Sequence, residues 1–162
     1  MHPDWNPNTQ RYDGDIAVLH LESDAQFNRF IQPICLLPSN TNVSAFNEGI
    51  VVGYGIGSAT SRTNENIPKI IKLPIHKNED CYRHNKEFAR ISSSNTFCAG
   101  TGSGSGVCSG DSGSGLYVKY GETYYLRGIV SASFFTSEGT CDVNDYAIFT
   151  SVNDYYNFVA GF

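Results

Sequence analysis

Cys108-Ser109-Gly110-Asp111-Ser112-Gly113 is the stretch of this 162-residue chain that decides most about its fold and chemistry. Ser112 stands among glycines and next to an acid. A serine hydroxyl becomes a nucleophile when a base removes its proton, and attack on a carbonyl needs backbone N–H groups aimed at the developing oxyanion. Glycines permit the sharp turn that presents such groups, because they adopt positive φ without steric cost. The stretch therefore predicts a nucleophile and an oxyanion hole, and it requires a histidine base from elsewhere.

Length and charge bound the remaining possibilities. A chain of 162 residues can form one medium domain or two small ones, and it is long enough to bury a core. The net charge of −5 at pH 7, with no basic block, gives no indication of nucleic-acid binding. No apolar run approaches the roughly 18 residues of a membrane span, and residues 1–6 contain no apolar core of a secretory signal. We expect no nucleic-acid or membrane partner, and no signal peptide on this chain.

The cysteines indicate an oxidising compartment. There are five of them: Cys35, Cys81, Cys98, Cys108 and Cys141. None belongs to a Cys-x-x-Cys pair and no histidine lies at zinc-finger spacing, so we expect no metal site. Well-separated cysteines in such a chain favour disulfides and an extracellular location. The odd number leaves one cysteine without a partner, which suggests a missing upstream segment.

Short apolar and alternating runs predict a mostly β domain. Expected strands cover residues 16–21, 50–55, 67–75, 116–120, 123–130 and 147–152. Pro68 and Pro74 at the ends of the third run suit an edge strand. Expected helices cover residues 79–88, capped by Asn78, and 152–162, capped by Asn153. Short strands separated by turns favour an antiparallel sandwich or barrel.

Asp15, directly before the apolar run 16–21, is the candidate partner acid. An acid at the edge of a buried strand can hold a histidine in one tautomer. Taken alone, such a residue is more often a solvated acid that caps the strand. The presence of residues 96–100, the Cys108 stretch and residues 128–131 in this order favours the catalytic role.

This set of motifs resembles the chymotrypsin-like (trypsin-like, S1) serine endopeptidases across nearly the whole chain. Residues 12–19 resemble the family's segment with the triad aspartate, residues 33–38 the connector between its two barrels, and residues 51–55 the first strand of its second barrel. The resemblance implies an all-β, antiparallel Greek-key double-barrel fold with a short intermediate helix and a C-terminal helix. Residues 1–44 would be the remnant of the first barrel with the connector, and residues 45–162 the complete second barrel.

The resemblance also assigns the catalytic residues. Ser112 is the nucleophile, Asp15 orients the base, and the N–H groups of Gly110 and Ser112 form the oxyanion hole. Asp111 matches the acid that pairs with the new N-terminus after activation cleavage in the family. The implied disulfides are Cys81–Cys98 and Cys108–Cys141. Cys35 is left to bridge to an upstream segment.

The substrate pocket is read from the same resemblance. Its base is Gly106, followed by Val107, and its walls are formed by Ser131, Ser133 and Ala147. This uncharged set predicts an apolar P1 side chain, large ones included, and not Arg or Lys. A different placement of one gap would bring Asp142 or Asp145 to the pocket wall and favour a basic P1 residue.

The histidine is the departure from the family pattern. The family order is His, Asp, Ser, but only His2 precedes Asp15, in a context that matches a surface loop. His20 lies within the run 16–21, where we expect it to be packed, and His76 and His84 come much later. We therefore expect a secreted serine endopeptidase, of cascade or digestive type, that needs no cofactor and acts on protein or peptide substrates. This chain alone, without the triad histidine, would be inactive. The alternative is a non-catalytic protease homologue that acts as a binding or regulatory module.

Overall fold

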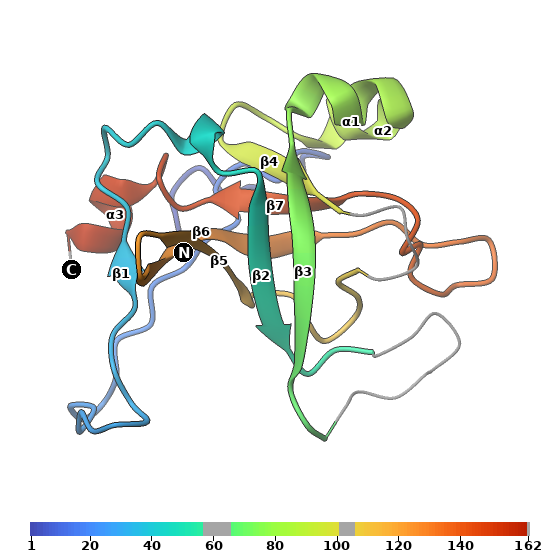
Figure 1. Cartoon of the computed structure of the whole chain (residues 1–162). Helices are drawn as coiled ribbons and strands as arrows, with labels where there is room; N and C mark the ends of the chain where they lie inside the picture. The colour runs from blue at the N-terminus through green and yellow to red at the C-terminus, as the bar shows by residue number, and fades with distance from the viewer. Residues whose placement is uncertain (57–65, 101–105, 162) are drawn as a thin grey trace.

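The computed structural model describes residues 1–56, 66–100 and 106–161. Seven strands of these residues share one sheet, in the order β1-β6-β5-β2-β3-β4-β7, and β6 also pairs with β7. The strands are β1 (Cys35–Leu36), β2 (Glu48–Gly53), β3 (Lys69–His76), β4 (Thr96–Ala99), β5 (Gly115–Tyr120), β6 (Thr123–Ala132) and β7 (Ala147–Ser151). The β6–β7 pairing closes β2 to β7 into a six-stranded antiparallel barrel (Figure 1), and β1 adds to β6 in parallel. This is the barrel architecture expected for the chymotrypsin-like fold.

Alternating apolar side chains fill the barrel. Val51, Leu73, Leu116, Val118 and Phe149 are at most 1% exposed. In strands, residues two apart share a face, so each strand contributes every second side chain to the interior. The tight filling fixes the strand register, because a slip of one residue would turn the apolar set toward solvent.

Two disulfides connect the barrel to the segments around it. Cys81–Cys98 joins the first helix to β4, and Cys108–Cys141 joins the Ser112 turn to the segment before β7. Both pairings are those that the resemblance implies. Cys35 is a free, exposed cysteine.

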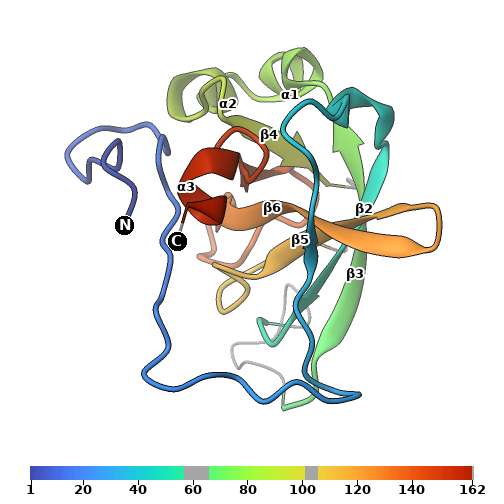
Figure 2. The same ribbon diagram turned by 90° about the vertical axis from the view of Figure 1, so that its left-hand side faces the viewer.

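The expected strand at residues 16–21 is wrong. No strand forms there, and Leu19 and Leu21 are 84% and 71% exposed. An apolar run becomes a strand only when a neighbouring strand satisfies its backbone hydrogen bonds, and the described part of the chain supplies no such neighbour. Instead, the N-terminal segment runs along the outside of the barrel before it returns as β1 (Figure 2). His20 on this segment is exposed, so the expectation that it is packed is also wrong.

The expected edge strand is an interior strand. β3 pairs with β2 along most of its length and with β4 at Ile75 and His76. Pro74 stands just before the β4 ladder, which begins at Ile75, and it has no N–H to donate there. Its carbonyl accepts from the N–H of Gly100 at 3.0 Å.

The helices differ from the expected ones in number and in where they begin and end. The expected helix at 79–88 is two helices, α1 (Asn78–His84) and α2 (Lys86–Ile91), separated by Asn85 in an extended conformation. Asn85, and not Asn78, is the capping side chain, accepting from the N–H of Glu87 at 3.0 Å. A short 3₁₀ helix covers Val43–Ala45, and the C-terminal helix α3 covers Tyr156–Ala160, later than Asn153 indicates. No described helix is long and apolar enough to cross a membrane.

Candidate active site

The turn that carries Ser112 has the conformation that its glycines predict. Gly110 and Gly113 have φ of +91° and +83°, where residues with a Cβ are strained. The turn is closed by hydrogen bonds from the N–H of Asp111 to the carbonyl of Cys108 and from the N–H of Ser114 to the carbonyl of Asp111, both 2.9 Å. Ser112 stays exposed. Within the described residues, the N–H groups of Gly110 and Ser112 have no acceptor, so both can bind an oxyanion.

The side chain of Asp111 points away from Ser112 and into the protein. Its carboxylate is 0% exposed and accepts from the N–H groups of Gly55 at 2.8 Å and Cys108 at 3.1 Å. The Nζ of Lys69 lies 3.2 Å from its Oδ2. A Cβ on Gly53 would lie 2.1 Å from Oδ1, so a glycine at the end of β2 leaves the space that the carboxylate fills.

Asp15 is held in place by two hydroxyl groups of the barrel. Ser131 at the end of β6 donates to its Oδ2 at 2.6 Å, and Thr150 of β7 donates to its main-chain carbonyl at 2.9 Å. Hydrogen bonds to a carboxylate are short and roughly twice as strong as neutral ones. Oδ1 has no hydrogen bond from the described residues, so it can accept one from a base.

Ser112, Asp15 and Ser131 line one open hollow of about 480 Å³. From the sequence, Ser131 is expected in the wall of the substrate pocket. In the structure its side chain lies beside Asp15. None of the described residues that line this hollow is a histidine. Among the described residues, the hollow is therefore lined by the hydroxyl of Ser112 and by the anchored acid Asp15, but by no histidine.

His2, His76 and His84 each contact a part of the molecule outside this hollow. The ring of His2 packs against Tyr155 and Phe158 on the C-terminal segment, both at 4.7 Å between centroids. The Nε2 of His76 lies 3.0 Å from the carbonyl of Gly100, and that of His84 lies 3.5 Å from Asp145.

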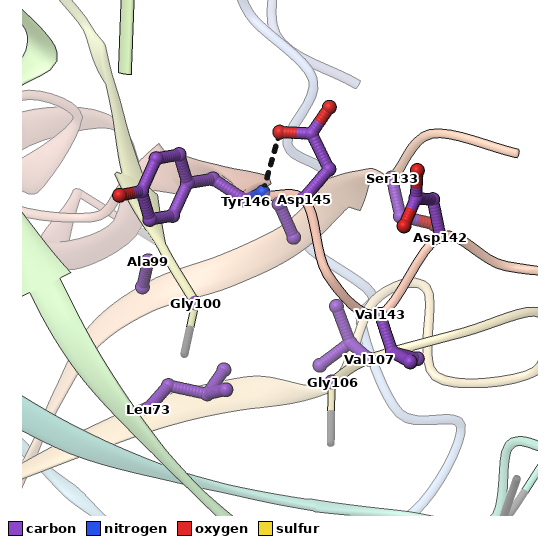
Figure 3. A pocket seen from close by; sticks show the side chains of 11 residues that line it. Leu73, Ala99, Gly100, Gly106, Val107, Ser133, Asp142, Val143, Asp145 and Tyr146 are labelled. Carbon is purple, nitrogen blue, oxygen red and sulfur yellow. Dashed lines mark hydrogen bonds between the residues drawn. The ribbon is translucent and has the colours of Figure 1, made fainter. Parts of the chain in front are cut away.

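The other predicted pocket residues come together around a second cavity. Gly106, Val107, Ser133 and Ala147 line a space of about 10 Å³, roughly that of one water molecule (Figure 3). Val143, which the sequence analysis did not single out, narrows it beside Gly106. Several of these residues lie near the end of a strand, which is why the barrel brings them together.

Asp142 and Asp145, which a different placement of one gap would bring to the pocket wall, also lie at this cavity. Figure 3 shows the carboxylates of Asp142 and Asp145 pointing away from Gly106. Asp145 accepts from the N–H of Tyr146 through Oδ1 and from Nδ2 of Asn85 through Oδ2, each at 2.7 Å. Asp142 accepts from the N–H of Asn144 at 3.1 Å. The part of the cavity next to Gly106 is consequently uncharged.

The described residues contain no cluster of three or more His, Cys, Asp or Glu side chains arranged to hold a metal ion.

Comparisons with known proteins agree with this geometry. The family model described as Trypsin matches residues 1–159. Serine protease gd of Drosophila melanogaster is 33% identical over 195 residues, which cover 100% of this chain and 36% of that protein. Vitamin K-dependent protein C of Oryctolagus cuniculus is 31% identical over 168 residues, covering 98% of this chain and 35% of that protein. A CLIP domain-containing serine protease of Bombyx mori, HP8, is 32% identical over 133 residues, covering 80% and 36%. The chain spans about a third of the length of these relatives.

Proposed function

The chain belongs to the trypsin family of serine proteases, and from that premise we propose that it carries the nucleophile and the partner acid of a secreted serine endopeptidase. The observation that carries the proposal is the hollow shared by Ser112 and Asp15, beside two N–H groups without an acceptor among the described residues. Nucleophile, acid and oxyanion donors are three of the four parts of acyl transfer.

In the proposed mechanism, Ser112 Oγ attacks the scissile carbonyl of a protein or peptide substrate. The N–H groups of Gly110 and Ser112 stabilise the negative charge on the carbonyl oxygen. Asp15, held by Ser131, fixes the tautomer of the histidine base and stabilises its protonated form. The histidine takes the proton of Ser112 Oγ and gives it to the leaving amine as the peptide C–N bond breaks, which leaves an acyl-enzyme on Ser112. Water then attacks the ester, with the histidine again as base, and releases the carboxylic acid product and the free serine. None of these steps needs a cofactor.

We propose that the base comes from sequence outside these 162 residues, because no described residue that lines the hollow is a histidine. Residues 1–44 are then the end of a first barrel, and residues 45–162 form the second. We call the protein that contains this chain together with its base-bearing N-terminal sequence the longer protein. The chain alone is inactive in this proposal. The exposed Cys35 is available for a disulfide to an upstream segment. The relatives that carry CLIP-domain and protein C names support a protease of the cascade type.

The cavity next to Gly106 supports a small apolar P1 side chain. It has space for about one water molecule, and its base is uncharged, so it fits a methyl group better than a phenyl ring or a guanidinium. This narrows the expectation from the sequence, which included large apolar side chains. A Cβ added at Gly106 would meet Val143 at 3.5 Å, an ordinary contact, so the position accepts a side chain.

A panel of peptide substrates for the longer protein tests this function. We expect kcat/KM for Ala at P1 to exceed that for Phe or Arg by about tenfold or more. In the Gly106→Asp variant we expect kcat/KM for Ala at P1 to fall and Arg to stay a poor P1 residue, because the carboxylate fills the space of about one water molecule that the P1 methyl group would occupy. A wild-type preference for Arg would show that Asp142 or Asp145 reaches the substrate. No hydrolysis of any peptide would favour the alternative, a non-catalytic homologue with a binding or regulatory role.

A further inference from the structure

The buried carboxylate of Asp111 forms an ion pair with Lys69 of the same chain. Lys69 is the first residue of β3, and its side chain is 19% exposed, whereas that of Asp111 is fully buried. An ammonium group has three N–H donors. Its Nζ contacts Asp111 Oδ2 at 3.2 Å, the carbonyl of Gly55 at 3.0 Å and the carbonyl of Ile56 at 2.5 Å. All three donors therefore have an acceptor.

The strand pattern directs Lys69 toward this carboxylate. Along β3, Ile71 and Leu73 are buried inside the barrel, and Ile70 and Lys72 are exposed. Lys69 shares the inward side with Ile71 and Leu73, because residues two apart lie on one face. A charge on the inner side of a barrel strand is costly unless it is paired and hydrogen-bonded. Here, the partner is the acid of the nucleophile turn.

The contacts of Lys69 connect three segments of the site. Through Gly55 and Ile56 it reaches the segment that follows β2, and the N–H of Ile56 donates to the carbonyl of Ser109 at 3.0 Å. Asp111 stands in sequence between Gly110 and Ser112, whose N–H groups have no acceptor among the described residues. The direction of its side chain therefore sets the orientation of the peptide groups on either side.

We propose that Lys69 is a positioning residue that holds Asp111 inward and so keeps the Gly110 and Ser112 N–H groups assembled without a newly generated chain end. This inference rests on the proposed function, since an assembled oxyanion hole matters only in a protease. In the resemblance to the family, Asp111 matches the acid that pairs with the new N-terminus after cleavage. In this chain, Lys69 already supplies a positive charge there, so the turn is ordered before any cleavage.

The order of the turn can be measured on this chain without hydrolysis. Backbone ¹⁵N relaxation gives order parameters, which are about 0.85 for rigid backbone and below about 0.6 for flexible backbone. We expect rigid values at Gly110 and Ser112 in the uncleaved wild-type chain. In Lys69→Met we expect flexible values at these two residues and unchanged values in β5 and β7.

Two further variants separate positioning from general stability. Lys69→Arg keeps a positive charge and should retain an ordered turn. Lys72→Met removes an exposed lysine of the same strand and should leave the turn unchanged. If Lys69→Met does not fold, Lys69→Gln, which keeps a hydrogen-bond donor but no charge, replaces it in the comparison with the same expected loss of order. A turn that stays rigid in the uncharged variant, or one that is flexible in the wild-type chain, would overturn the proposal.

The outcome is separable from that of the proposed function. A rigid turn that loosens in the Lys69 variant, together with a longer protein that hydrolyses no peptide, would leave the role of Lys69 intact and remove the enzyme. If the longer protein hydrolyses peptides but the order of the turn does not depend on Lys69, the protease function stands and the role of Lys69 is removed.

Discussion

Replacement of Asp15 by Asn is expected to lower the kcat of the longer protein by about 10⁴-fold, the effect of this exchange in a serine-histidine-aspartate triad. The amide keeps an oxygen that can accept from Ser131, so the site retains its shape. Its NH₂ group, however, donates where the base needs an acceptor, and it carries no charge to stabilise an imidazolium. The measurement is steady-state hydrolysis of the best peptide substrate.

Asp13→Asn is the matched control for this variant. Asp13 is two residues away, half-buried, and its side chain has no hydrogen bond to the described residues. We expect its kcat to match the wild type. An Asp15→Asn variant within tenfold of the wild type would mean that a different acid orients the base.

Replacement of Ser112 by Ala is expected to lower kcat by about 10⁶-fold, because removing the nucleophile of a triad costs as much as removing the whole triad. Some catalysis over water, about 10³–10⁴-fold, should remain, since the two N–H groups and substrate binding are unaffected. For the same reason the Asp15→Asn, Ser112→Ala double variant should be no slower than Ser112→Ala alone.

Ser109→Ala controls for a serine in the same turn. Its side chain is exposed, and only its main-chain carbonyl takes part in the site. Its kcat should stay close to that of the wild type. Equal losses in the two serine variants would show that the turn is disturbed by substitution and that the hydroxyl of Ser112 is not the nucleophile.

The conformation of the turn that carries Ser112 could be predicted, because it depends on residues that are adjacent in the sequence. Glycines at 110 and 113 are required by positive φ, and a serine between them is presented to solvent. Five of the six barrel strands, β2, β3, β5, β6 and β7, were also predictable, because their apolar side chains reflect burial in the barrel. The strand β4 was not expected; it is short, and all four of its residues are buried, so it shows no alternation. The disulfides came from the resemblance, since spacing alone leaves several pairings open.

The features that could not be predicted from the sequence depend on hydrogen bonds between segments that are far apart in the chain. Residues 16–21 have an apolar run but no neighbouring strand, so they stay irregular. Ser131 was predicted as a wall of the substrate pocket, but the fold brings its hydroxyl to Asp15, which is 116 positions away in the sequence.

Lys69 was missed, although the sequence carries a signal for it. Lys69 and Lys72 are three positions apart in one strand, so they must lie on opposite faces, and one of them must point inward. That inward lysine requires a buried acid. Only the fold shows that the acid is Asp111.

Labelling with a fluorophosphonate probe tests the central claim most directly, because the probe reacts only with a serine that has an activating base and an assembled oxyanion hole. Peptide mapping by mass spectrometry identifies the modified residue. In the longer protein we expect rapid labelling at Ser112, and in the 162-residue chain alone we expect none. Rapid labelling of the chain alone would contradict the claim that its base lies elsewhere. A longer protein that remains unlabelled at Ser112 would contradict its assignment as the nucleophile.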